Sequence, residues 1–190
     1  MNEPESRARR ADATRNRDQL LAAAGRAFIA SDTEPSMRAI AREAGVGIAT
    51  LYRHFPTRED LVEAIYRDQV SGLTAGAREL LAQYPAPVAL RRWMDLFGTW
   101  IAAKNGMLDT LLALIESGGI SHGQTQIELL AAIDSLLEAG RTRGEFRSDV
   151  TAEDIAAGLI GIFTVARPPE HDARANRLLD LLLDGLQFRP

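Results

Sequence analysis

Residues 36–55 constrain the fold of this chain more than any other stretch, because they predict two short helices joined by a tight turn. Ser36 is a good N-cap for the first helix. Gly45 permits the left-handed backbone that ends it, and a second helix starts near Gly47. Two short helices at a fixed angle are the arrangement that enters the major groove of DNA. The alternative is a plain helical hairpin buried in a core.

The second helix has two kinds of face. Val46 and Leu51 are expected to anchor the turn and the helix in the core. The other positions carry small residues, a hydroxyl, a phenol and basic groups, which suits a groove lined by base edges and phosphates. The candidate DNA-binding residues of this region are Ser36, Arg38, Gly47, Ile48, Ala49, Thr50, Tyr52, His54 and Arg58.

Sequence motifs in the N-terminal third resemble those of the TetR family of bacterial transcriptional regulators. The motifs lie at residues 20–24 with Phe28, at residues 40–46 and at residues 50–61. Many members have a glycine where Asp32 stands here, and aspartate tolerates left-handed backbone better than most residues, so we expect the fold to persist. Residues 88–93 and 178–186 are similar to one subgroup of C-terminal domains in that family.

The resemblance and the helix geometry together imply which residues read bases. Residues 47–50 face base edges, and Ile48 or Ala49 contacts a thymine methyl group. Arg38 is the best candidate for a bidentate contact with guanine. The alternative for Arg38 is a solvated side chain.

Other residues are expected to position the helices on phosphates. Tyr52 and His54 are the first two, and Arg58 is the third, at the N-terminus of the following helix where the dipole helps. The alternatives are core packing for Tyr52 and a helix C-cap for His54. Arg53 is instead interpreted as an ion-pair residue.

The charge is uneven, which reconciles DNA binding with a net charge of −4. Residues 7–17 contain five arginines and one aspartate, and residues 36–58 contain four arginines and one glutamate. Residues 61–190 hold 12 basic and 17 acidic side chains. This pattern is typical of a basic DNA face on an acidic body. Residues 1–13 are expected to be a flexible basic arm along phosphates or in a minor groove; the alternative is a solvated tail.

Several classes of protein are disfavoured by composition. The chain has no cysteine, which excludes disulfides, thiol catalysis and cysteine-bound zinc. We expect a cytoplasmic protein without membrane contact, because it has no long apolar run and its N-terminus is polar. The three histidines lie far apart and no phosphate-binding glycine loop occurs. The sequence therefore predicts no enzyme activity, no metal and no cofactor.

Helical periodicity without any strand pattern predicts an all-α chain of about nine helices. We expect a flexible arm at residues 1–13, a helix-turn-helix DNA-binding domain at 14–72, and an effector-binding and dimerisation domain at 73–190. A long connector helix is predicted over residues 58–83.

The last two helices carry apolar stripes that predict a homodimer built as a four-helix bundle. The candidate interface residues are Leu159, Ile162, Phe163, Leu178 and Leu182. The alternative is that these stripes face the chain's own core. A two-fold dimer would present two heads to successive major grooves of a palindromic operator in double-stranded DNA.

A cluster of large apolar side chains in the body is the candidate effector site. It consists of Trp93, Phe97, Trp100 and Met107, and the alternative is an ordinary core. The resemblance implies a repressor released from its operator by a small apolar or aromatic ligand. An activator or a co-repressor-dependent regulator of the same fold is the alternative, as is a helical adaptor that acts through protein contacts.

Overall fold

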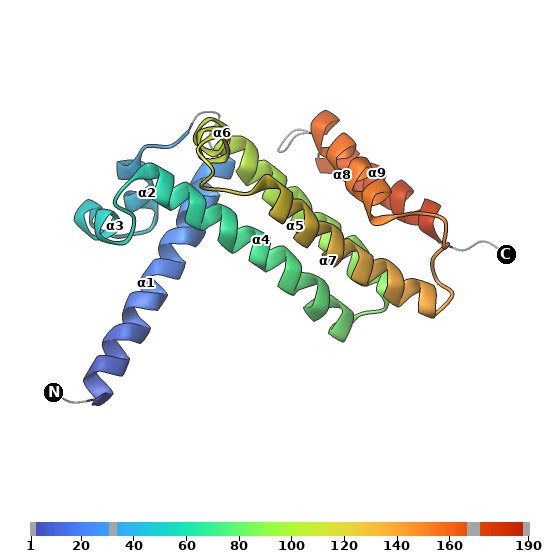
Figure 1. Ribbon diagram of the computed structural model, residues 1–190, viewed down its shortest axis with the longest axis horizontal. Helices are drawn as coiled ribbons and strands as arrows, with labels where there is room; N and C mark the ends of the chain where they lie inside the picture. The colour runs from blue at the N-terminus through green and yellow to red at the C-terminus, as the bar shows by residue number, and fades with distance from the viewer. Residues whose placement is uncertain (1–2, 31–33, 167–171, 188–190) are drawn as a thin grey trace. The chain divides into compact units, whose positions relative to one another are not determined.

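The chain is all-α, as predicted. The computed structural model describes every residue except 1–2, 31–33, 167–171 and 188–190, so the expected backbone at Asp32 lies outside the described residues. The described part forms nine helices and no strand (Figure 1). In order they are α1 (Glu3–Ala30), α2 (Met37–Glu43), α3 (Ile48–His54), α4 (Arg58–Gln83), α5 (Ala86–Gly106), α6 (Leu108–Glu116), α7 (His122–Thr142), α8 (Ala152–Val165) and α9 (Asp172–Leu186). None of these described helices is long and apolar enough to cross a membrane.

The chain divides into two compact units, each built from two separate stretches of sequence. Residues 1–68 and 103–120 form the first, here called the head unit, and residues 69–102 and 121–190 form the body unit. The boundary falls inside α4 and α5, which continue through it as unbroken helices. The sequence predicts one boundary between domains, near residue 72. In the structure the chain returns along α5 to the head unit, so α6 belongs to that unit as well.

Helix α1 begins at Glu3, although the sequence predicts a flexible arm to residue 13 and a helix only from Thr14. Pro4 occupies the first turn, where its missing N–H costs no hydrogen bond. The following twenty residues, up to Ala24, contain neither proline nor glycine and are rich in alanine and arginine, both good helix formers. The arginine-rich segment is therefore part of a helix and not a flexible tail.

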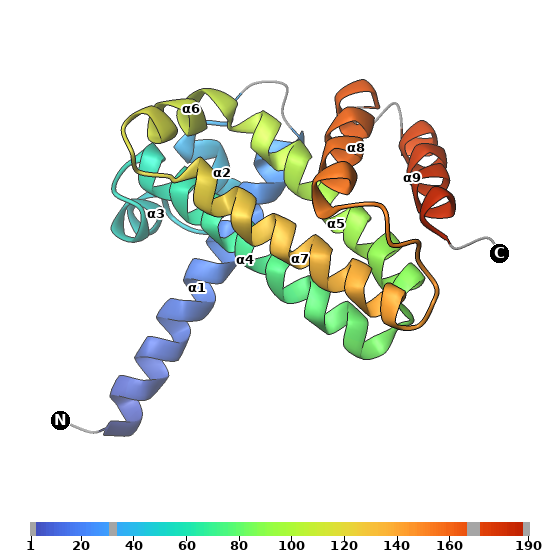
Figure 2. The same cartoon turned by 45° about the vertical axis from the view of Figure 1, so that its right-hand side comes forward.

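The core of the body unit depends on glycines that let helices approach closely. A Cβ atom added at Gly98 on α5 would lie 2.5 Å from the ring of Phe163 on α8. A Cβ at Gly140 on α7 would overlap the ring of Phe146, which is buried. Helices α8 and α9 lie side by side in both views (Figure 2). Each glycine thus creates the space that a neighbouring aromatic ring fills.

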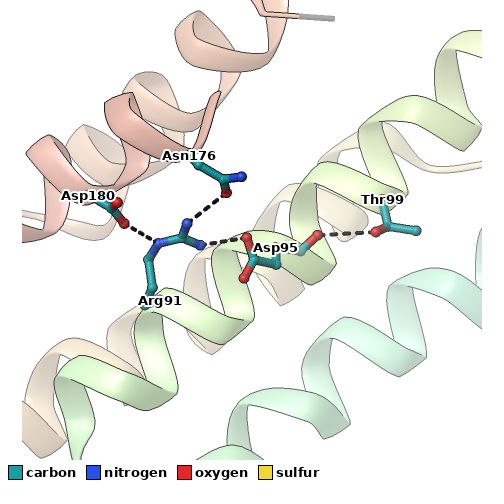
Figure 3. Close-up of polar contacts among 5 residues, drawn as sticks. All are labelled: Arg91, Asp95, Thr99, Asn176 and Asp180. Atoms are coloured by element: carbon teal, nitrogen blue, oxygen red, sulfur yellow. Dashed lines mark hydrogen bonds and ion pairs between the residues drawn. The ribbon is translucent and has the colours of Figure 1, made fainter. Parts of the chain in front are cut away.

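Arg91 links α5 to α9 within the body unit (Figure 3). Its guanidinium donates to Asp180 at 2.7 Å and to Asn176 at 2.9 Å, both on α9, and to Asp95 one turn further along α5. Partial burial opposes the charged form, but the bonds to Asp180 and Asp95 outweigh it and raise the pKa of Arg91 above its ordinary value. The position of α9 is therefore fixed by a directed polar contact as well as by apolar packing.

Candidate nucleic-acid interface

The first helix of the predicted pair starts at a side-chain cap. The Ser36 hydroxyl accepts a hydrogen bond from the backbone N–H of Ala39 at 3.2 Å, as expected of an N-cap. Met37, Ile40 and Ala41 are buried and hold α2 against the rest of the head unit. Ser36 is thus occupied in capping, although its residue is exposed.

The turn has the backbone geometry that the glycine predicts. Gly45 has a φ of +66°, in the left-handed region that costs glycine little. Its N–H donates to the carbonyl of Arg42 at 3.1 Å, and the N–H of Val46 donates to that of Ala41 at 3.0 Å. These bonds satisfy carbonyls at the end of α2 and fix the angle at which α3 leaves.

Helix α3 is anchored on one face and open on the others. Leu51 is fully buried, and Phe55 just after the helix is 2% exposed. Arg17 of α1 places its guanidinium 5.5 Å from the centre of the Phe55 ring, a cation–π contact that ties α1 to the end of α3. The anchors therefore leave the remaining surface of α3 available to a partner.

The predicted readers of DNA lie mostly at the surface. Gly47 and Ala49 are exposed, while Ile48 and Thr50 are half-buried. Tyr52 is 47% exposed, so it does not pack in the core of this chain. His54 is half-buried beside Phe55, with ring centres 6.3 Å apart.

Two arginines near the helix pair differ in their contacts. Arg38 is exposed and makes no ion pair or hydrogen bond with any described residue. Arg53 donates to the Thr50 hydroxyl at 3.0 Å and so makes a hydrogen bond where the sequence predicts an ion pair. The Thr50 hydroxyl, which is expected to face the bases, therefore already accepts a hydrogen bond from the Arg53 guanidinium in the same helix.

Arg58, the predicted phosphate contact at the start of α4, has partners within the head unit. Its guanidinium pairs with Glu34 at 3.1 Å and donates to the carbonyl of Pro35 at 2.6 Å. Only 26% of its side chain is exposed. Sequence reasoning missed this partner because a single glutamate in a loop carries no pattern that predicts a contact twenty-four positions away.

The aromatic cluster of the body unit is packed as a core. Trp93 and Phe97 have ring centres 5.6 Å apart, and Phe97 and Trp100 have centres 5.2 Å apart. The Trp93 indole donates to the carbonyl of Leu73 at 2.9 Å. All three residues are buried, and so is Met107, which belongs to the head unit. The structure thus brings together three of the four predicted effector residues.

The predicted dimer residues differ in how deeply they are buried within the chain. Leu159 is fully buried and Phe163 is 6% exposed, because its ring fills the space at Gly98. Ile162, Leu178 and Leu182 are half-buried. The largest exposed apolar side chains on these helices are others that the sequence did not single out, namely Ile160, Val165 and Leu181.

Two family profiles match this sequence. Residues 20–65 match the bacterial regulatory proteins of the tetR family. Residues 85–188 match the C-terminal domain of SbtR-like transcriptional regulators. The chain belongs to the TetR family. As a TetR-family regulator it is a DNA-binding protein, and the helix pair described above lies within the residues that match the tetR-family profile.

Solved structures agree with this assignment. A TetR transcriptional regulator from Streptomyces coelicolor is 44% identical over 92% of this chain and 99% of its own, with a TM-score of 0.85. A TetR transcription regulatory protein from Mycobacterium vanbaalenii is 33% identical over 94% of this chain and 99% of its own, with a TM-score of 0.73. A search among curated proteins found no match.

Proposed function

We propose that this TetR-family protein is a homodimeric repressor. In the proposal it acts in the bacterial cytoplasm, binds a palindromic operator, and leaves it when a small apolar or aromatic ligand binds. The observation that supports operator binding is the contrast between adjacent residues of α3: Leu51 is fully buried and Tyr52 is 47% exposed. A helix that is anchored in the core on one face and exposed on the other is suited to binding in the major groove of DNA. The proposal assigns the chain no catalytic reaction.

The base-reading surface in this proposal is the exposed side of the helix pair. Arg38 supplies a free guanidinium that can form two hydrogen bonds with guanine. The small residues Gly47 and Ala49 allow close approach to base edges, Ile48 lies between them, and Tyr52 meets a phosphate. The arginine-rich start of α1, residues 7–17, would add contacts along the backbone, because its charge attracts phosphates regardless of sequence.

The proposed dimer forms through the outer faces of α8 and α9. Ile160, Val165 and Leu181 are 54%, 60% and 65% exposed, which is a high cost for large apolar side chains in water. The half-buried Leu178 and Leu182 would complete the surface. Two copies related by a two-fold axis would then offer two head units to half-sites about 34–36 Å apart.

A charge introduced at this surface tests the dimer. We expect the double variant Ile160→Glu, Leu181→Glu to elute as a monomer in size-exclusion chromatography with light scattering. The matched control is Ile127→Glu on α7, because Ile127 is 64% exposed in the same unit but lies on another helix. A double variant that remains dimeric would place the interface elsewhere.

The proposed effector is apolar because the interior of the body unit is aromatic. Both tryptophans of the chain, Trp93 and Trp100, belong to this cluster, so tryptophan fluorescence, excited at a wavelength that tyrosine does not absorb, reports on it alone. We expect a small set of aromatic and aliphatic compounds to include one that changes the emission and weakens operator binding. Compounds that weaken DNA binding without changing the emission would place the effector site elsewhere.

Selection of genomic fragments by the purified protein at about 150 mM salt tests operator binding directly. The proposal expects an enriched palindrome, with enrichment lost in the variant Tyr52→Ala. Enrichment of no sequence in the absence of ligand, but of a palindrome after adding one, would indicate a co-repressor-dependent regulator. Binding without any sequence preference under either condition would favour the adaptor.

A further inference from the structure

One carboxylate in the head unit joins three segments that are distant in sequence. Glu34 accepts hydrogen bonds from the backbone N–H of Thr110 at 3.1 Å and from the Thr110 hydroxyl at 2.8 Å. The same side chain pairs with Arg58 at 3.1 Å. Thr110 is in the first turn of α6 and Arg58 is the first residue of α4. Glu34 itself lies two residues before Ser36, the N-cap of α2.

Helix α6 depends on this carboxylate for its N-terminal cap. Its own N-cap residue is Met107, whose side chain makes no capping bond. The first N–H groups of a helix lack partners within the helix, and they carry a partial positive charge that favours an anion. Glu34 supplies both the acceptor and the charge from another part of the chain. The contact between Glu34 and Thr110 therefore takes the place of the missing side-chain cap of α6.

Arg58 completes the arrangement on the other side. Its guanidinium holds the Glu34 carboxylate with one nitrogen and the carbonyl of Pro35 with another, so it fixes the backbone that enters α2. The Arg58 and Glu34 side chains are only 26% and 21% exposed. Ion pairs shielded to this degree are weakened less by solvent than surface pairs are.

An independent contact holds the junction of α5 and α6 in the same unit. A Cβ atom added at Gly106, the last residue of α5, would overlap the backbone carbonyl of Phe28 on α1. The start of α6 is thus pressed against the end of α1 while Glu34 bonds to its first turn. The segment that carries Glu34 is the connection from α1 to α2.

We infer that Glu34, held by Thr110 and Arg58, is a positioning residue for operator binding. It sets where α2 begins relative to α6, and small displacements of a reading helix remove base contacts. Arg58 acts through Glu34 and does not contact phosphate. This inference rests on the proposed operator binding and deepens it, because it names Glu34 as the residue through which the reading helices depend on Thr110 of α6.

The test measures operator affinity in variants of Thr110, a residue outside the helices that read DNA. Thr110→Val removes the hydroxyl and keeps the shape, and Thr110→Ser keeps the hydroxyl. Thr125→Val is the matched control, because Thr125 is a similarly buried threonine on α7 whose hydroxyl donates to the carbonyl of Ser121, the N-cap of the same helix. All variants are measured well below their unfolding temperatures, on the palindrome that the wild-type protein selects.

We expect Thr110→Val to weaken operator binding about fivefold, the lower end of typical coupling between sites. Thr110→Ser and Thr125→Val should bind as the wild type does. Glu34→Ala should weaken binding about tenfold, and adding Thr110→Val to it should cost little more, because Glu34→Ala already removes the acceptor of the Thr110 hydroxyl. A folded Thr110→Val protein with wild-type affinity would overturn the inference.

The salt dependence of Arg58→Gln provides a second measurement. Removing a phosphate contact lowers the slope of log affinity against log salt by about one. We expect Arg58→Gln to weaken binding with an unchanged slope. A lowered slope would overturn the role assigned to Arg58. If the wild-type protein selects no DNA at all, it is the proposed function that fails, and that result is distinguishable from both outcomes.

Discussion

Arg38 of the head unit and Arg91 of the body unit differ in whether the chain compensates their charge. Arg38 on α2 is exposed and has no partner among the described residues, whereas Arg91 on α5 is bonded to two aspartates and an asparagine. Both side chains are cations in a protein of net negative charge. The difference is that the Arg91 side chain is only 20% exposed, so its charge must be compensated within the chain.

Arg91 helps to hold the fold, whereas Arg38 is the charge that we propose for a partner. A solvated arginine contributes little to stability, but it loses little when it leaves water for a phosphate or a base edge. A compensated arginine would have to break existing bonds first. The state of each arginine in the unbound chain therefore indicates its role.

The largest effect is expected from Gly106→Ala, which disrupts the head unit and leaves the body unit intact. The new Cβ would overlap a backbone carbonyl of α1, which cannot turn away as a side chain can. We expect a loss of about 3 kcal/mol in unfolding free energy, measured by urea denaturation.

Two other glycines serve as controls for this change. Gly98→Ala in the body unit meets the ring of Phe163, which can shift, so it should cost less, about 1–2 kcal/mol. Gly123→Ala on α7 meets no atom within 4 Å and should be neutral or slightly stabilising. Alanine favours helix over glycine at all three positions, so only steric overlap can make the change costly, and equal losses in all three variants would contradict the role assigned to close packing.

Arg38→Ala should separate the two roles of arginine most directly. We expect operator affinity to fall by about 1–3 kcal/mol, with relaxed preference at one base position and unchanged unfolding free energy. Arg78→Ala, at an exposed arginine of the body unit, is the control and should change neither quantity. If Arg38→Ala weakens binding to all sequences equally, Arg38 contacts only phosphate.

Arg91→Met should show the reverse pattern, a loss of stability with little change in operator affinity. Methionine keeps the apolar stem, so the loss reports on the polar contacts, and we expect about 1 kcal/mol because both aspartates are more than half exposed. Thermal unfolding at low and high salt measures it. The control is Arg177→Met on α9, the helix that Arg91 contacts. An equal loss of stability in this variant would mean that Arg91 has no special role.

The smallest effect concerns pH and the capping box of α8. The backbone N–H and the hydroxyl of Thr151 donate to Asp154, which lowers the pKa of this carboxyl from its ordinary value of 3.8. A lowered pKa in the folded chain gives stability that is present above pH 3.8 and lost as the pH falls through the folded value. We expect Asp154→Asn to lower the melting temperature slightly at pH 7, with the difference from wild type vanishing in acid. Glu153→Gln is the control, and a difference that persists at low pH would contradict the prediction.

The fold was largely predictable because its signals are local. Caps and breakers such as Ser36, Gly45 and Thr151 act within a few residues of their own positions, and they place helix ends correctly without knowledge of packing. The beginning of α1 lies earlier than the sequence predicts, because the arginine-rich segment has the charge of a tail but is built from arginine and alanine, which favour helix.

The site was predictable only where it is contiguous. The helix pair carries its own pattern, so residues such as Tyr52 and Arg38 could be named from sequence. Glu34 and Thr110 are seventy-six positions apart, and neither stands in a motif, so only the folded chain brings them together. Periodicity likewise identifies the apolar residues of α8 from sequence. It does not show which of them face outward, because that depends on packing: Leu159 is buried and its neighbour Ile160 is exposed.

The division of the head unit between two stretches of sequence has a consequence for how the protein is made. During synthesis the helix pair leaves the ribosome early, but residues 103–120 follow only after half of the chain has been translated. Until then Glu34 has no α6 to bond, and α1 has no Gly106 against it. The head unit therefore completes its folding late, and a nascent chain cannot present the helix pair in its final geometry before residues 103–120 have been synthesised.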